Sequence, residues 1–476
     1  MPTIRNREKI IFVSSGMLNA KKKDNPIAFN HSYLNYGLLG LASIVRANGY
    51  DVSLYHGKFD NPSRFLEKYM DSFNKVNNYP IFLSLPSSFA IEWAKIFVSE
   101  LKKMNPKASV IVGGRWVVME DGKWIKEKFN NQIDLVVYGL SENRIIQLLN
   151  RQEWTNIHYT DLSVDLTPEK WHGNFPKYDY SIMPDYKEFQ PSIDTSRGCG
   201  NGCSFCLEGK IKLVSMKDPN LIIEEVIYLQ ELYKDILISF YFEASHFSPS
   251  KKWIEKFSEL VKTQKLSFKW RAETRADNNI ITENLSLLAE VGLKVLDIGL
   301  ESASPRQLLA MGKTKDYKDY LQKASKLLQS CRDCDVWAKI NILLYPGECA
   351  ETIRETTNWL DLHKECIKGV SVNPLMVYRN TSYVDYLKEL RQEYGAFPVE
   401  NSIEEKGYCY MHLSKEMQLE QIESLRVELC QRYMSADDYY DLKSFSYFSG
   451  SILSKEDFVN KCNKVDKTKL PFRVSS

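Results

Sequence analysis

The sequence lacks any apolar run long enough to cross a bilayer, and its first nine residues are polar, without the hydrophobic segment of a secretory signal. It also lacks an excess of either charge: 63 Lys and Arg face 61 Asp and Glu, for a formal net charge of +2. This balance argues against bulk binding to nucleic acid or acidic membranes. Ten cysteines in 476 residues are too few for a disulfide framework. We therefore expect a cytoplasmic globular protein with no membrane and no nucleic-acid partner.

Residues 1–150 alternate short apolar runs with helical patterns, which is typical of a parallel α/β sheet. The predicted strands are 9–14, 50–55, 80–85, 108–113 and 133–138, and the predicted helices between them include 36–47, 61–73 and 90–104. Right-handed crossovers between them give a doubly wound, Rossmann-like domain that binds its ligand at the carboxyl ends of the strands. Gly113, Gly114 and Gly139 close two of these strands, where they either let the backbone approach a ligand or simply shape the loops.

A second α/β alternation begins at residue 191, after a stretch at 151–190 whose prolines and aromatics interrupt the periodicity and predict a linker. The predicted strands of residues 191–378 are 192–196, 238–244, 268–273, 295–301, 336–344 and 369–375, separated by helical patterns. Six βα units in series predict a partial (β/α)6 barrel, with its chemistry at the C-terminal ends of the strands. Residues 379–476 are predicted to form a helical region rich in aromatic side chains.

Three cysteines lie close together directly after the first strand of this barrel. Cys199, Cys203 and Cys206 follow a Cys-x3-Cys-x2-Cys spacing on a glycine-rich loop, so all three thiolates can turn toward one metal centre. A structural zinc site normally requires four protein ligands, and the fourth would have to be Glu208, His246 or a remote cysteine. An iron–sulfur cluster with one open iron needs only these three.

This loop, with the aromatic Phe205 before its last cysteine, resembles the signature of radical S-adenosylmethionine (SAM) enzymes. The resemblance implies that Cys199, Cys203 and Cys206 bind a [4Fe–4S] cluster and that Phe205 contacts the adenine of SAM. In such enzymes the open iron chelates SAM, and one electron from the cluster cleaves it to a 5′-deoxyadenosyl radical that abstracts hydrogen from the substrate.

Later strand ends resemble further parts of the same family. Glu243 stands where the family often places an acidic group near the SAM amino group, and a carboxylate suits an ammonium. The pair Glu273 and Arg275 is similar to the family's Glu-Thr-Arg stretch, whose arginine commonly contacts SAM; a guanidinium suits the methionyl carboxylate. Glu301 and Ser302 resemble the Gly-x-Glu-Ser motif that closes on the SAM ribose and carboxylate. For Glu243, Glu273 and Arg275 a structural ion pair is the alternative.

The N-terminal half resembles the cobalamin-binding domain that precedes the barrel in one large subclass of the family. The resemblance rests on the segment 36–42 that opens the first helix, on Gly113-Gly114, and on the Tyr-Gly-Leu-Ser-Glu segment that includes Gly139, Ser141 and Glu142. It implies that the residues of the last two patterns lie against cobalamin. The sequence departs from other cobalamin proteins because it has no Asp-x-His-x-x-Gly motif to supply a lower axial histidine.

The leading hypothesis is a radical SAM methyltransferase that uses a [4Fe–4S] cluster, SAM and cobalamin to methylate an unactivated carbon of a small-molecule substrate. It would need an external electron donor. One alternative is a non-methylating radical reaction (dehydration, rearrangement, epimerisation or carbon–carbon bond formation), with or without cobalamin. A third hypothesis is a non-catalytic binding protein stabilised by zinc.

Overall fold

The computed structural model describes residues 9–19, 28–74, 78–119, 122–149, 175–206, 208–236, 238–379, 381–400, 402–448 and 453–474. The described chain divides into two compact units, one built mainly from residues 9–149 and 175–186, the other from residues 28–31 and 187–474. Most of the predicted linker, residues 151–174 of 151–190, lies outside the described residues. No helix in the described ranges is long and apolar enough to cross a membrane.

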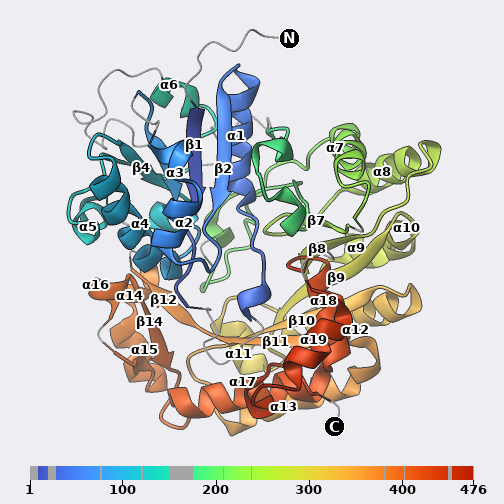
Figure 1. The fold of residues 1–476 in the computed structure, drawn as a ribbon. Coiled ribbons are helices and arrows are strands. Elements are labelled where there is room, and N and C mark those ends of the chain that lie inside the picture. The colour runs from blue at the N-terminus through green and yellow to red at the C-terminus, as the bar shows by residue number, and fades with distance from the viewer. Residues whose placement is uncertain are drawn as a thin grey trace. The chain divides into compact units, whose positions relative to one another are not determined.

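The first unit contains a five-stranded parallel sheet in the order β2-β1-β3-β4-β5 (Figure 1). Its strands are β1 (Lys9–Ser14), β2 (Asp51–His56), β3 (Ile81–Ser84), β4 (Val110–Gly113) and β5 (Leu135–Val136). Its α-helices are α1 (Tyr36–Ala47), α2 (Pro62–Lys68), α3 (Met70–Phe73), α4 (Ile91–Met104), α5 (Gly122–Lys128) and α6 (Ile145–Leu149). Five of the six residues of β1 are buried, as expected for a strand covered on both faces. This strand order confirms the predicted doubly wound sheet, with its topological switch between β1 and β3.

The second unit contains a six-stranded parallel sheet whose strands are arranged in sequence order, from β6 to β11. Its strands are β6 (Ser192–Asp194), β7 (Phe240–Glu243), β8 (Trp270–Arg275), β9 (Leu293–Glu301), β10 (Trp337–Leu344) and β11 (Gly369–Pro374). The helices between them are α7 (Pro219–Leu232), α8 (Lys251–Thr263), α9 (Asn279–Glu283), α10 (Leu285–Glu290), α11 (Pro305–Ala310), α12 (Tyr317–Asp333) and α13 (Ala350–Leu362). Figure 1 shows α7, α8, α10 and α12 in a row along one side of the sheet. The predicted partial barrel is confirmed.

Helices dominate the rest of the chain, which also forms a small antiparallel sheet that the sequence did not predict. The sheet has the order β12-β14-β13, from β12 (Met376–Tyr378), β13 (Phe397–Pro398) and β14 (Tyr408–His412). The helices are α14 (Ser382–Asp385), α15 (Leu387–Tyr394), α16 (Ile403–Lys406), α17 (Leu419–Tyr433), α18 (Ala436–Ser444) and α19 (Lys455–Cys462). Strands of two to five residues carry too little alternation to be recognised in sequence.

The aromatic residues of the C-terminal helices form a separate hydrophobic core. Tyr439, Phe448 and Phe458 are buried there together with Val295 of β9, and the sulfur of Met434 fills the space beside Gly369, the first residue of β11. Val295 and Gly369 lie near the amino ends of their strands. The C-terminal helices therefore pack at the end of the sheet opposite the carboxyl edge.

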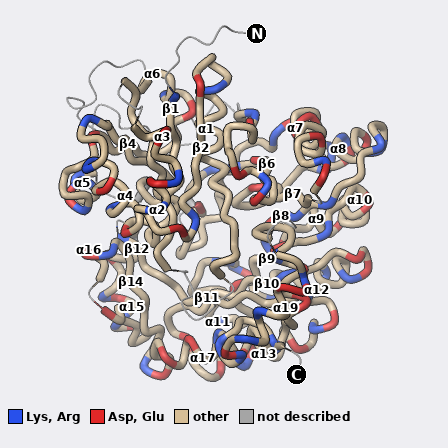
Figure 2. The backbone as a smooth tube through the Cα atoms, in the orientation of Figure 1, with Lys and Arg blue, Asp and Glu red and all other residues tan. Residues whose placement is uncertain are grey.

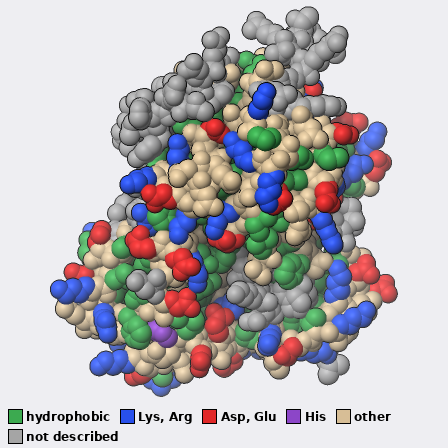
Figure 3. Space-filling view, turned by 60° about the vertical axis from the view of Figure 1, so that its left-hand side comes forward, with side chains coloured by type: hydrophobic (Ala, Val, Ile, Leu, Met, Phe, Trp, Pro, Cys, Tyr) green, Lys and Arg blue, Asp and Glu red, His purple; other side chains and the backbone are tan. Residues whose placement is uncertain are grey.

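Charged residues of both signs are interleaved along the surface helices, for example α7, α8 and α12 (Figure 2). The face drawn in Figure 3 likewise carries Lys and Arg side chains scattered among Asp and Glu. This pattern agrees with the near-zero net charge of the sequence.

Candidate functional site

The three-cysteine loop leaves the carboxyl end of β6 and folds back on the segment that follows it. The Cys199 N–H donates to the Ile211 carbonyl at 2.9 Å, and the Val214 N–H donates to the Arg197 carbonyl at 3.0 Å. Gly198 has a φ of +72°, and a Cβ atom there would lie 2.3 Å from the Lys212 carbonyl oxygen. The loop can adopt this path only because residue 198 has no side chain.

Each of the three sulfurs has N–H groups directed toward it. Asn201 Nδ2 lies 2.9 Å from Cys199 Sγ, and Arg275 Nη1 lies 3.3 Å from Cys203 Sγ. Burial raises the pKa of Cys206, the backbone N–H groups of Glu208 and Gly209 oppose this, and the charges of the other two cysteines raise it further. The three thiolates are therefore close enough to repel one another. N–H donors offset such repulsion and are the surroundings that a thiolate cluster requires.

A single metal ion would need ligands that converge on one point. In the described part of the chain, no three His, Cys, Asp or Glu side chains are placed to hold such an ion. A cubane cluster instead binds each cysteine through a different iron, so its cysteines need not converge. The two side chains considered for zinc have other partners: Glu208 accepts a hydrogen bond from Ser245 at 3.1 Å, and His246 lies 3.4 Å from the Thr274 hydroxyl. The residues thus fit a cluster better than a mononuclear zinc.

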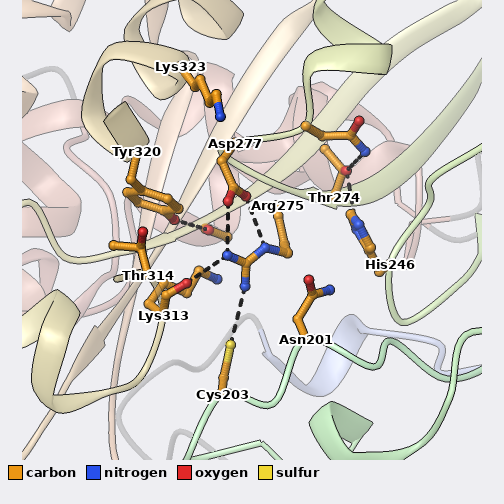
Figure 4. Close-up of polar contacts among 12 residues, drawn as sticks. Asn201, Cys203, His246, Thr274, Arg275, Asp277, Lys313, Thr314, Tyr320 and Lys323 are labelled. Atoms are coloured by element: carbon orange, nitrogen blue, oxygen red, sulfur yellow. Dashed lines mark hydrogen bonds and ion pairs between the residues drawn. The ribbon is translucent and has the colours of Figure 1, made fainter. Parts of the chain in front are cut away.

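Arg275, at the carboxyl end of β8, is held by several groups at once (Figure 4). Its guanidinium binds both carboxylate oxygens of Asp277, at 2.9 and 3.1 Å, and donates to the Lys313 carbonyl at 2.7 Å as well as to Cys203. Its carbon centre lies 6.0 Å from the ring centroid of Tyr320. Burial disfavours the charged guanidinium, but Asp277 outweighs this and raises the pKa of Arg275. The side chain expected to bind the SAM carboxylate is thus engaged by the protein.

The end of β9 is strained. Glu301 has a φ of +67°, a left-handed conformation that costs an ordinary residue about 1–2 kcal/mol. Its carboxylate pairs with the buried Lys313 at 3.0 Å. The hydroxyl of Ser302 is buried and lies 3.0 Å from that of Thr356 in α13, so it anchors this helix to the strand end. Such strain persists where the surroundings fix it and is frequent at functional sites.

Two carboxyl groups face the interior of the partial barrel from adjacent strands. Glu243 ends β7 and accepts a hydrogen bond from the Ser192 hydroxyl at 2.8 Å. Burial raises the pKa of Glu243 to about 8, so it carries a proton at neutral pH. Glu273 on β8 is partly exposed and lies 3.5 Å from the Tyr241 hydroxyl. The pair provides an acidic surface for a cationic group.

A layer of buried charges lies on β8, β9 and β10, nearer to the amino ends of these strands. Asp297 pairs with both Arg271 and Lys339, the latter at 2.7 Å. Burial, and then the charge of Arg271, lower the pKa of Lys339 to about 8. The interior of the partial barrel is therefore polar in this layer as well, unlike its apolar outer face, where the alternate residues of β10 are buried.

The structure places the remaining predicted residues as follows. Phe205 lies partly buried on the turn between Cys203 and Cys206. In the first unit, Gly113 ends β4, and Gly114 has a φ of +114° with Ser84 Oγ 2.6 Å from the position of a Cβ. Gly114 thus allows close packing on the end of β3.

The other predicted residues of the first unit form one short turn. Gly139 has a φ of +68°, and the Ser141 hydroxyl lies 3.4 Å from its carbonyl. The Ser141 carbonyl accepts from the Ile145 N–H at the start of α6, and Glu142 lies between them.

Sequence reasoning missed several residues at both sites. In the barrel these are Asp277 and Lys313, and only Asp277, two positions after Arg275, had a recognisable signal.

In the first unit, Asn35 links the ends of three strands. Its Nδ2 donates to Ser14 at 3.1 Å and to Ser84 at 3.0 Å, and its backbone N–H lies 3.3 Å from His56 Nε2. Burial lowers the pKa of His56 to about 4, so this imidazole is neutral. Nothing local in the sequence indicates these long-range contacts.

Fold and site together define an α/β enzyme whose partial barrel carries a three-cysteine loop at its carboxyl edge. Residues 193–360 match the Radical SAM superfamily, so this part of the chain is a radical SAM domain. This domain match implies a [4Fe–4S] cluster and SAM as cofactors. No curated protein sequence matches the chain.

Solved structures show the same architecture at low sequence identity. The radical SAM methyltransferase TsrM from Kitasatospora setae, with tryptophan substrate and a SAM analogue, is 15% identical, with a TM-score of 0.66 over 91% of this chain and 89% of that one. The same protein with cobalamin and a [4Fe–4S] cluster gives 0.63 over 86% and 84%, again at 15% identity. The cobalamin-dependent SAM radical enzyme OxsB, with aqua-cobalamin bound, is 14% identical, with a TM-score of 0.63 over 86% of this chain and 65% of that one. These likenesses show a shared fold.

Proposed function

We propose that the enzyme binds cobalamin in addition to the cluster and SAM, and that it methylates an unactivated carbon of a small-molecule substrate. The observation that supports this is the combination, in one chain, of a doubly wound unit and a barrel with the three-cysteine loop, in an architecture shared with TsrM and OxsB. When bound, the cluster supplies the electron that cleaves SAM to a 5′-deoxyadenosyl radical, and cobalamin supplies the methyl group.

The residues of the barrel would bind and orient the cofactors. Cys199, Cys203 and Cys206 would hold the cluster, with the N–H donors described above stabilising their charge. Phe205 would contact the adenine. Glu243 holds its proton at neutral pH because it is desolvated, so a bound ammonium would displace that proton and take its place.

Other carboxylates would complete the SAM site. Glu273 would share the SAM ammonium with Glu243, because the two carboxyl groups lie on adjacent strands. Glu301, fixed by Lys313 in its strained conformation, would face the ribose, while Ser302 anchors the strand end to α13. The polar barrel interior suits a polar substrate.

The residues of the first unit would receive the cobalamin. Gly113 ends β4, and Gly114, Gly139, Ser141 and Glu142 lie in the loops that follow β4 and β5, at the carboxyl edge where doubly wound sheets bind their ligands.

Anaerobic reconstitution tests the cluster. Wild-type protein should take up iron and sulfide and turn brown, and Cys203→Ala should not. Cys334→Ala is the matched control, because this partly exposed thiol at the end of α12 lies outside the loop and should leave iron uptake unchanged. Stoichiometric zinc with no iron and no SAM binding would contradict the proposal.

Two further measurements test the methylation. Protein incubated with hydroxocobalamin and passed over a desalting column should retain the corrinoid. Turnover should release both S-adenosylhomocysteine and 5′-deoxyadenosine, since methyl transfer and radical formation each consume one SAM. Release of 5′-deoxyadenosine alone would support a non-methylating radical reaction instead, and loss of the corrinoid on the column would exclude cobalamin.

A further inference from the structure

Arg275 connects a cluster cysteine to the rest of the barrel. Its Nη1 lies 3.3 Å from Cys203 Sγ, while Nε and Nη2 are occupied by the Asp277 carboxylate and Nη2 also by the Lys313 carbonyl at 2.7 Å (Figure 4). Every nitrogen of the guanidinium therefore has a partner within the protein. A guanidinium that is available to bind the SAM carboxylate would keep at least one pair of its N–H groups without a protein partner.

The partners of Arg275 are themselves fixed. The Lys313 side chain is only 4% exposed and forms an ion pair with Glu301. The buried Tyr320 hydroxyl donates a hydrogen bond to the carbonyl of Leu300, the residue before Glu301. The Arg275 side chain is 12% exposed. To reach another anion, the guanidinium would have to break its two-point contact with Asp277. The geometry keeps the positively charged guanidinium of Arg275 beside the sulfur of Cys203.

We propose that Arg275 is a positioning residue that tunes the cluster, with Asp277 and the Lys313 carbonyl aiming its N–H at Cys203 Sγ. The proposal rests on the proposed function, because it requires a cluster on Cys203. A hydrogen bond to a ligating sulfur stabilises the added negative charge of the reduced cluster and raises its reduction potential. Cys203 is 7% exposed, so little water competes with this contact.

The test is a redox titration followed by electron paramagnetic resonance, on anaerobically reconstituted protein without SAM. Arg275→Gln should shift the midpoint to a more negative potential, with the equilibrium constant for reduction falling about tenfold, equivalent to about 59 mV for one electron. Arg275→Lys keeps the positive charge but lacks the planar guanidinium, so it should give a smaller shift of the midpoint potential in the same direction. Arg306→Gln is the control, because Arg306 makes a similar 3.2 Å contact with Cys349, outside the loop, and should leave the midpoint unchanged.

The outcomes separate the possible failures. A midpoint potential that is unchanged in both Arg275 variants at wild-type iron content would overturn the inference. If the same variants also bind SAM more weakly, Arg275 would instead be a ligand of the SAM carboxylate. If Arg275→Gln takes up no cluster, the Arg275→Lys titration decides alone. Wild-type protein that holds no iron would overturn the proposed function itself.

Discussion

One added methyl group at Gly198 should weaken cluster binding without changing any ligand. In Gly198→Ala the new Cβ would lie 2.3 Å from the Lys212 carbonyl oxygen, at a φ of +72°. Gly202→Ala is the matched control, because Gly202 is in the same loop with a φ of +70° and has no atom within 4 Å of its Cβ position. The two variants therefore share the backbone penalty and differ in the clash.

The difference between the variants can be worked from the structure. Both should lose about 1–2 kcal/mol for an L-residue in the left-handed region. Gly198→Ala must also push the Lys212 carbonyl away, which breaks the Cys199–Ile211 and Val214–Arg197 backbone hydrogen bonds at about 1 kcal/mol each. The extra cost of about 2 kcal/mol is roughly a thirtyfold loss in affinity.

Competition with an iron chelator measures that loss. Gly198→Ala should release its iron at a chelator concentration about thirtyfold below that for Gly202→Ala. Equal iron retention by the two alanine variants would refute the reasoning, because it would mean that the close approach of the two loop segments does not shape the cluster site.

Two further predictions concern stability. Burial raises the pKa of Glu243 from 4.5 to about 8, so its contribution to stability is present at low pH and is lost as the pH rises through this window. Between about pH 5 and about pH 9 the melting temperature of wild type should therefore fall more than that of Glu243→Gln, and parallel pH profiles would contradict this. Lys217→Met should cost about 3–5 kcal/mol of unfolding free energy, because it removes the ion pair between two buried side chains, Lys217 and Glu225. Lys256→Met, which removes an exposed pair with Asp218, should cost under about 1 kcal/mol in the same denaturant titration, and equal losses would refute the burial argument.

Local patterns predicted most of the secondary structure. The predicted strand 9–14 and helix 36–47 coincide with β1 and α1, because an uninterrupted apolar run and an apolar stripe that follows the N-cap Asn35 are visible in sequence. The predicted helix 61–73 is instead broken at Tyr69 into α2 and α3, since Tyr69 leaves the helical conformation with a φ of −115°. The last strand of the first sheet is shorter than predicted, with only Leu135–Val136 paired to β4.

The candidate site was only partly predictable. The cysteine spacing and the succession of polar strand ends lie within short segments, so the sequence indicates both. The partners of those residues lie in other segments, so the sequence does not indicate them. Ser302 binds Thr356 and Glu301 binds Lys313, and neither pair follows from spacing. The roles of these side chains in binding cofactors stay predictions.

What the sequence by itself determined is the pair of parallel sheets and the sulfur-rich loop, because hydrophobic periodicity and ligand spacing are properties of neighbouring residues. Only the tertiary structure decided where Arg275 points. An arginine can satisfy any nearby anion, and the choice of Cys203, 72 positions earlier in the chain, depends on the distance between two strand ends in the folded barrel.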